Sequence, residues 1–382
     1  MASSENINIA AKRLLETPLY DWHREHGGRM VEFAGWSMPI QYGSIIEEHH
    51  QTRNAIGMFD VSHMGRLYFE GPQVDQFLDR LTTRRIAGVE PGKIRYSLMT
   101  NAEGGILDDV LVYHLPHLST SESDSSYHMM VVNASNREKI VAWLKSNQSL
   151  APQVKLVDRT EETAMIAVQG PQANWAVAKF AQIDPTILPY YTGTSTTVCG
   201  CPAILSRTGY TGEDGCEIIV AANDAEPIWA EIYGLAKEMG GGAAGLAARD
   251  TLRLEAGMPL YGHELSETIN PSQADLKFAI NLKNRDFIGK EAILAATRDA
   301  SLPVRVGLEL KDRRPAREHS TVLHQGQPVG EVSSGTFSPS LQKSISMAYL
   351  KPELAVAGTL LQIDIRGKLH EAKVVKLPFY QR

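Results

Sequence analysis

Cysteine is scarce in this chain of 382 residues, which contains only Cys199, Cys201 and Cys216. Three thiols cannot form the disulfide framework that stabilises many small secreted domains. The CGC spacing at 199–201 has no second cysteine pair or histidine cluster beside it, so it does not indicate a metal site. We therefore expect small buried side chains at these positions and no bound metal.

Long apolar runs and an excess of positive charge are missing as well. No apolar stretch approaches the roughly 18 residues of a membrane span. The first twenty residues, MASSENINIAAKRLLETPLY, lack the apolar core of a signal peptide, and their acidic residues argue against a transit peptide. A formal net charge of −6 excludes general affinity for nucleic acid or anionic membranes. These absences predict a cytoplasmic protein, bacterial by default, that binds neither nucleic acid nor membranes.

The length and periodicity of the chain indicate more than one domain. With 43% hydrophobic and 21% charged residues, the composition is that of a globular protein large enough for two or three domains. The spacing of apolar residues predicts a helix over 72–82, and Ser135 with Glu138 has the spacing of a capping box before another helix. Short strands, hairpins and helices mix up to residue 285, which favours α+β layers. A serine-rich stretch at 118–126 predicts a flexible insertion.

Strand signals dominate the last part of the chain. Residues 286–302 form a charged connector with one short helix. From residue 303 to 382, apolar alternating segments are separated by turn residues, which predicts a β-barrel or sandwich-like domain.

Two adjacent acids stand in a predicted strand, GGILDDVLVY, at residues 104–113. Aspartate is depleted from strands, and buried carboxylates are costly unless they are paired. Neighbouring strand residues point to opposite faces, so Asp108 and Asp109 face different apolar surroundings. Two interpretations are open. The carboxylates are hydrogen-bonded structural groups, or one of them lines a ligand cavity and has a pKa raised by burial.

Other charged residues also lie in apolar segments. Glu217 opens the strand after the loop SRTGYTGEDG, which lacks the ending of a phosphate-binding loop. A buried glutamate needs a partner, either an internal arginine or a ligand with two adjacent N–H donors. Arg249 and Arg253 lie four residues apart on a predicted helix, where a salt-bridged face is the usual explanation. His63, between a strand and a turn, is more often structural than catalytic. These features are consistent with an enzyme but do not identify one.

Several phrases of the sequence, in this order, resemble the T-proteins of the glycine cleavage system, which are tetrahydrofolate-dependent aminomethyltransferases. The phrases are MVEFAGWSMPIQY, GMFDVSHMGR, GGILDDVLVY, VVNASN, SRTGYTGEDGCEI, GLAARDTLRLEAGMPLYGHEL and SSGTFSPSLQKSISMAYL. The resemblance extends from about residue 17 to the C-terminus. It implies a three-domain cloverleaf around a central folate channel, with two interleaved α+β domains over 12–285, a connector over 286–302 and a C-terminal β-barrel domain over 303–382.

The resemblance also implies a reaction and its partners. An aminomethyl group on the lipoyl arm of the H-protein would donate its methylene to tetrahydrofolate. Ammonia, 5,10-methylenetetrahydrofolate and dihydrolipoyl H-protein would be released. The other glycine cleavage proteins would associate loosely with this one.

Site residues follow from the same resemblance. It assigns the catalytic carboxylate to Asp109 and leaves Asp108 a structural role. Glu217 would hold the pterin ring through its ring N–H and amino group. Further folate-pocket positions are Tyr96, Tyr113, Asn133, Tyr210 and Arg249, with Met64 in the wall and Tyr380 of the C-terminal tail approaching the site.

Alternatives of the same fold remain open. Folate-dependent demethylases take a methyl group instead, although the complete GGILDDVLVY phrase favours aminomethyl transfer. Non-transferase relatives in iron–sulfur assembly or RNA modification carry a K-G-C-Y-x-G-Q-E type motif, and the comparable stretch GMPLYGHELSETINP lacks its cysteine. A non-catalytic folate-binding relative is a further class.

Overall fold

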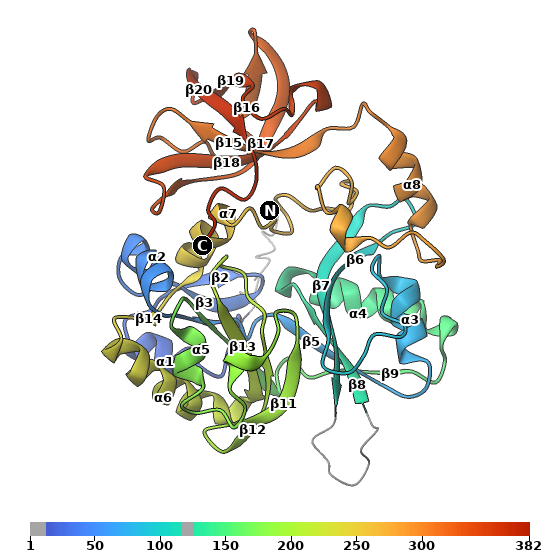
Figure 1. The fold of residues 1–382 in the computed structure, drawn as a ribbon, viewed down its shortest axis with the longest axis vertical. Helices are drawn as coiled ribbons and strands as arrows, with labels where there is room; N and C mark the ends of the chain where they lie inside the picture. The colour runs from blue at the N-terminus through green and yellow to red at the C-terminus, as the bar shows by residue number, and fades with distance from the viewer. Residues whose placement is uncertain (1–12, 117–125) are drawn as a thin grey trace, which may run out of the picture.

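The computed structural model describes residues 13–116 and 126–382. The start of the N-terminal segment and nearly all of the serine-rich insertion lie outside the described residues. Three bodies are visible in Figure 1, with a barrel above two separate sheets. The expected α+β fold with a C-terminal β-barrel is confirmed.

The first body is a six-stranded sheet with helices packed on one face. Trp229 and Ile232, on the apolar side of its longest helix, are completely buried against the sheet. In sheet order the strands are β11 (Gly193–Val198), β12 (Cys201–Ser206), β13 (Gly215–Ala221), β10 (Thr163–Gln169), β4 (Gly57–Asp60) and β14 (Gly242–Ala243). The helices of this core are α1 (Tyr20–Glu25), α5 (Ala173–Val177) and α6 (Ala225–Glu238).

The second body is a five-stranded sheet. Its order is β6 (Ile94–Thr100), β7 (Ile106–Pro116), β8 (Ser126–Val132), β5 (Gly65–Glu70) and β9 (Lys155–Asp158). The β6–β7 hairpin is antiparallel, as the turn between the two strands predicts. The predicted helix is present as α3 (Val74–Leu81), whose apolar stripe of Val74, Phe77, Leu78 and Leu81 is buried, and α4 (Arg137–Ser146) packs into the same core.

The chain moves between these bodies more than once. It leaves the first sheet after β4, builds the second sheet and returns to the first at β10. A small three-stranded sheet precedes β4, made of β1 (Leu15–Glu16), β3 (Trp36–Gln41) and β2 (Arg29–Phe33). Two further helices, α2 (Ile45–Asn54) and α7 (Leu246–Glu255), contact each other, and α7 also contacts β3 and the barrel. Figure 1 shows α7 directly beneath the barrel.

The barrel closes the C-terminal part of the chain. Its strands, in order around the barrel, are β15 (Val304–Leu310), β18 (Lys343–Leu350), β17 (Gln327–Ser338), β16 (Thr321–His324), β19 (Leu360–Ile365) and β20 (Lys368–Val375). The short helix of the charged connector is α8 (Lys290–Arg298). Single 3₁₀ turns are η1 (Ala134–Asn136), η2 (Gln148–Leu150), η3 (Pro185–Ile187), η4 (Ala222–Asp224), η5 (Lys277–Ala279) and η6 (Pro352–Leu354). Among the described residues, no helix combines the length and the apolar character needed to span a membrane.

Candidate active site

A cavity of about 1270 Å³ lies where the two larger sheets, helix α7 and the barrel meet. Strand β7 contributes to its wall from the second sheet, β13 from the first and β17 from the barrel. Ligand pockets commonly measure about 300–1,000 Å³. This cavity is therefore larger than a typical ligand pocket.

The acid pair is divided between this cavity and the protein interior. Asp109 lines the cavity, whereas Asp108 is completely buried and is not part of the wall. Asp108 accepts hydrogen bonds from the Asn133 backbone N–H at 3.0 Å, Asn133 Nδ2 at 2.8 Å and Asn136 Nδ2 at 2.6 Å. Asp109 accepts from Asn133 Nδ2 at 2.7 Å and from the Tyr96 hydroxyl at 3.2 Å. The Asn133 amide therefore connects the two carboxylates.

The two carboxylates are coupled through burial and proximity. Burial raises the pKa of Asp108, and the nearby charge of Asp109 raises it further. Burial also raises the pKa of Asp109, although hydrogen bonds from Asn133 and Tyr96 act against it. A carboxylate with a raised pKa at a cavity wall can accept a proton or stabilise a positive charge near neutral pH.

An aromatic pair extends from Asp109 toward the surface. The Tyr96 ring stacks on Phe278 with ring centroids 5.7 Å apart and an interplanar angle of 21°. Both residues line the cavity, and Phe278 is 61% exposed. A flat ring on this path would find an apolar surface beside the Asp109 carboxylate.

Glu217 lies in another part of the wall, on the buried strand β13. Its side chain is 5% exposed, and Thr208 Oγ1 donates a hydrogen bond to Glu217 Oε2. Burial raises the pKa of Glu217, while the Thr208 hydrogen bond and the positive charge of Arg249 act in the opposite direction. This acid can therefore accept N–H donors from a ligand in the cavity.

Arg249 faces the same cavity from helix α7. Its guanidinium lies over the Tyr210 ring at 4.8 Å, and Tyr210 donates its hydroxyl proton to the Pro259 carbonyl. Within the described part of the chain, Arg249 Nη1 is buried without a hydrogen-bond partner, and Arg249 forms no ion pair with Glu217. Burial lowers the pKa of Arg249. A carboxylate and a guanidinium that face one cavity without pairing with each other fit a ligand with both donors and acceptors.

The prediction of a salt-bridged helix face is therefore wrong for Arg249. It holds for Arg253, which pairs with Asp250 at 2.8 Å and with Glu264 at 2.8 Å.

His63 and Met64 line the cavity in the link between β4 and β5. His63 is 3% exposed, its Nδ1 has no partner among the described residues, and its ring meets Phe33 edge-on at 5.5 Å. Burial lowers the pKa of His63 to about 3, so its imidazole is neutral at physiological pH.

Two of the expected pocket residues lie outside the cavity wall. Tyr113 is completely buried, and its hydroxyl faces Ser206 Oγ at 3.5 Å. Tyr380 places its ring over the Arg53 guanidinium at 4.0 Å, and its backbone N–H donates to the Glu255 carbonyl at 2.9 Å. The cavity wall does contain the remaining expected residues, Asp109, Glu217, Arg249, Asn133, Tyr96, Tyr210 and Met64.

Sequence reasoning missed Thr208, Ser206 and Phe278. A threonine in the loop immediately before a buried glutamate could have indicated a hydrogen-bond donor for that acid. An exposed phenylalanine in a turn gives no comparable signal, because single exposed apolar residues are common on protein surfaces.

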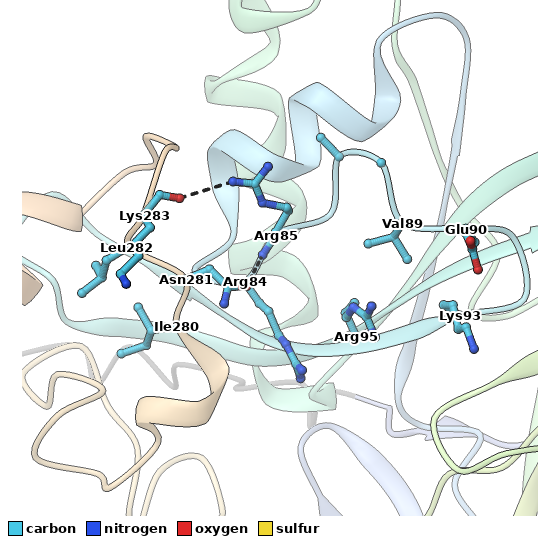
Figure 2. Close-up of a pocket in the computed structure, with 12 residues that line it drawn as sticks. Arg84, Arg85, Val89, Glu90, Lys93, Arg95, Ile280, Asn281, Leu282 and Lys283 are labelled. Atoms are coloured by element: carbon cyan, nitrogen blue, oxygen red, sulfur yellow. Dashed lines mark hydrogen bonds between the residues drawn. The ribbon is translucent and has the colours of Figure 1, made fainter.

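A second, open groove of about 760 Å³ carries positive charge. Figure 2 shows the Arg84, Arg85, Lys93 and Arg95 side chains around it, with Lys283 on the facing segment. Arg85 is held by the carbonyl of Lys283, but no ion pair involves any of these five cations in the described residues. Burial and the neighbouring charge of Arg95 lower the pKa of Arg84. The groove also contains one acid, Glu90, so its cations outnumber its acids and fit a ligand with several carboxylates.

The charged groove adjoins the large cavity. Phe278, in the cavity wall, is followed two residues later by Ile280, which lines the groove. Tyr191 lines the cavity, and the positive charge of Arg84 acts on its hydroxyl. A ligand that starts in the cavity and passes Phe278 would therefore reach the cations.

Metal-binding groups are not assembled in the described residues. No cluster of three or more His, Cys, Asp or Glu side chains is placed to hold a metal ion there. The three cysteines are free thiols, and Cys216 is buried.

Family comparisons match nearly the whole chain. Residues 19–284 match the GCVT N-terminal domain, and residues 304–381 match the glycine cleavage T-protein C-terminal barrel domain.

Individual relatives agree with these matches. The chain is 41% identical to an aminomethyltransferase of Symbiobacterium thermophilum, with 98% of this chain and 99% of the relative covered. It is 38% identical to an aminomethyltransferase of Bacillus subtilis, with 97% and 100% covered. The crystal structure of the glycine cleavage system aminomethyltransferase T from Bartonella henselae superimposes with a TM-score of 0.87 and 31% identity, covering 96% of this chain and 98% of that one.

Proposed function

This chain belongs to the glycine cleavage T-protein family of aminomethyltransferases, and we propose that it transfers the methylene of aminomethyl-lipoyl H-protein to tetrahydrofolate. In the balanced reaction, the methylene loses its bonds to the lipoyl sulfur and the amine nitrogen. It gains bonds to N5 and N10 of the folate, whose two N–H protons leave with the thiol and the ammonia. The products are 5,10-methylenetetrahydrofolate, ammonia and dihydrolipoyl H-protein.

The observation that supports this reaction most strongly is the set of unpaired polar groups around one cavity. A pterin presents a ring N–H beside an amino group, which matches the two oxygens of Glu217. Arg249 Nη1, buried without a partner in the described residues, can donate to a pterin acceptor atom. Asp109 lines the same cavity at a separate point, where it can face the reacting nitrogens.

Turnover with purified H-protein tests the proposal directly. Aminomethylated H-protein and tetrahydrofolate should yield ammonia and methylenetetrahydrofolate in equal amounts. A folate-dependent demethylase of this fold would instead act on a free N-methyl amine and release no ammonia from H-protein. A non-catalytic folate-binding protein would bind tetrahydrofolate and turn over neither donor, and either outcome would overturn the proposal.

Glu217→Ala tests the pterin anchor. The substitution removes the charged acceptor of two hydrogen bonds, so folate affinity should fall by about 1.5–3 kcal/mol, the range for hydrogen bonds to charged groups. Calorimetric titration of folded protein measures the change. Glu318→Ala is a matched control, because Glu318 also lines the cavity but pairs with His263 at 3.0 Å near the surface. Equal folate affinity for wild type and Glu217→Ala would refute the anchor.

The charged groove fits the glutamyl end of the same folate. With the pterin at Glu217 and the reacting nitrogens at Asp109, the aminobenzoyl ring would continue along Tyr96 and Phe278. Its carboxylates would then meet the cations of Figure 2. Longer glutamyl tails would make more contacts with Lys93 and Arg95.

A double substitution, Lys93→Gln with Arg95→Gln, should reduce the preference for oligoglutamyl over monoglutamyl folate. Exposed ion pairs contribute roughly 0.2–1 kcal/mol each, so the preference should fall by a few-fold and should weaken with salt. Competition binding with the two folates measures the ratio. Lys368→Gln with Lys373→Gln, two exposed cations on the barrel strand β20, removes the same charge and serves as the control. An unchanged ratio in the double variant would place the glutamyl tail elsewhere.

A further inference from the structure

A row of hydroxyl groups runs from Glu217 into the protein interior. Thr208 Oγ1 donates to Glu217 Oε2, Ser206 Oγ lies 2.8 Å from Thr208 Oγ1, and the Tyr113 hydroxyl lies 3.5 Å from Ser206 Oγ. Tyr113 and Ser206 are 0% exposed, and Thr208 is 1% exposed. These side chains are therefore shielded from solvent.

The two sheets hold this row in place. Ser206 and Glu217 are direct partners in the β12–β13 ladder, so strand register fixes their separation. Thr208 follows two residues after Ser206. Tyr113 reaches the row from β7, the strand that also carries Asp109. The row therefore connects β13 of the first sheet to β7 of the second.

Counting protons gives the row a direction. Each hydroxyl has one proton to donate. Because Thr208 donates its proton to the carboxylate, Ser206 is the donor in its 2.8 Å contact with Thr208, which is shorter than its 3.4 Å contact with the Glu217 carbonyl. Tyr113 is then the donor to Ser206. This arrangement ends on an ionised Glu217, and Glu217 Oε1 receives no hydrogen bond from the described residues. Oε1 and the second lone pair of Oε2 therefore remain available to the two N–H donors of a pterin.

Charge around Glu217 makes the Thr208 hydroxyl important. Burial raises the pKa of this acid, and a protonated carboxyl group could not accept two N–H donors. Several titratable side chains face Glu217 in the described residues. Of these, only Arg249 is ionised at neutral pH. The others are tyrosines and a cysteine, which are neutral at this pH, and burial raises their pKa values further; they are Tyr113, Tyr190, Tyr191 and Cys216. Without the Thr208 hydroxyl, Arg249 alone would oppose the effect of burial.

We propose that Thr208, supported by Ser206, is a positioning residue that keeps Glu217 ionised and directs its free oxygen toward the folate. This inference rests on the proposed function, because it assumes that Glu217 binds the pterin. Thr208 acts through Glu217, so its removal should affect folate binding and leave the chemical step intact.

Thr208→Val tests the inference, since valine keeps the shape and removes the hydroxyl. Tetrahydrofolate should bind about tenfold more weakly at neutral pH, as expected for the loss of one hydrogen bond to a charged group. The deficit should grow as pH falls from alkaline to mildly acidic, because Glu217 then takes up a proton more readily. Wild-type affinity should stay flat over the same range. The turnover number at saturating folate should be unchanged.

Control variants separate positioning from packing. Thr208→Ser restores the hydroxyl and should restore both the affinity and the flat pH profile. Ser206→Ala should produce a smaller loss in the same direction. Thr196→Val removes another buried hydroxyl of the same sheet, which has no partner in the described residues, and should change nothing.

Several outcomes would overturn the inference. Wild-type affinity in Thr208→Val would do so, as would a pH-independent loss that Thr208→Ser does not restore. If Thr208→Val does not fold, Ser206→Ala tests the inference instead. A folate affinity in Ser206→Ala that depends on pH as in wild type would then contradict the role of the hydroxyl row. Failure of the wild-type enzyme to bind tetrahydrofolate would instead reject the proposed function.

Discussion

Asp109→Asn is expected to lower the single-turnover rate by roughly 10²–10⁴, the usual range for a positioned acid–base or electrostatic group. Folate affinity should change little, because the lost interaction develops only in the transition state. Asparagine keeps the shape of the side chain, and its amide can still bond to Asn133 and Tyr96. Rapid-mixing measurements with aminomethylated H-protein, together with folate titrations, test both parts of this prediction.

The expected loss follows from the charge that develops during the transfer. When N5 forms a bond to the methylene, the folate gains positive charge. Asp109, ionised and held in a cavity that excludes much water, stabilises that charge. The same carboxylate can accept a folate proton while ammonia leaves. Since burial raises the pKa of Asp109, the rate should fall as pH decreases through a value above the roughly 3.9 of a free aspartate. The rate of the Asp109→Asn variant should not show this decrease at low pH.

Asp108→Asn is the matched control one residue away. All the donors around Asp108 are N–H groups, two from Asn133 and one from Asn136. An amide NH₂ in place of one oxygen would put a donor against a donor, which costs stability. This variant should therefore lower the melting temperature more than the turnover rate. If Asp108→Asn abolished turnover while Asp109→Asn retained it, the roles of the two acids would be reversed.

Local periodicity accounts for what the sequence predicted well. Strand alternation assigned Asp108 and Asp109 to opposite faces because the period of two is a property of the backbone alone. The helix stripe at Val74–Leu81 follows from a similar local rule. Neither inference depends on how distant segments meet.

Tertiary contacts explain the failures. The capping box at Ser135 and Glu138 does not form, because η1 occupies that turn and the Asn136 side chain donates to Asp108 instead of capping α4. The two arginines of α7 look alike in the sequence. Arg253 pairs with Glu264 in the segment that follows α7, while Arg249 is left facing the cavity. Only the folded chain shows which arginine is available to a ligand.

Helix α7 connects the cavity to the barrel through a second buried group, Glu255. Its carboxylate accepts hydrogen bonds from Arg53 Nη2 at 2.8 Å on α2 and from Ser340 Oγ at 2.8 Å after β17. His49 Nε2 lies 3.2 Å away, and the side chains of both Glu255 and His49 are 0% exposed. Arg53 also pairs with Glu213 at 2.9 Å. Glu255 thus connects α2 and the barrel to the C-terminal end of α7, the helix that also carries Arg249.

Glu255→Gln should destabilise the protein by about 1.5–3 kcal/mol, the range for hydrogen bonds to a charged group, because Arg53 loses one of its two buried carboxylate partners and keeps Glu213. Burial alone would raise the pKa of Glu255, but His49, Ser338 and Arg53 hold it at about 2. A depressed pKa stabilises the fold above the unfolded value of about 4.3, and this stability is lost as pH falls toward the folded value. Denaturant unfolding at neutral and acidic pH should therefore show a large difference between wild type and variant that shrinks in acid. Glu371→Gln, which breaks an exposed pair with Lys311, should leave the midpoint unchanged. A Glu255→Gln protein as stable as wild type at neutral pH would show that the barrel is held by its apolar contacts with α7 rather than by this carboxylate.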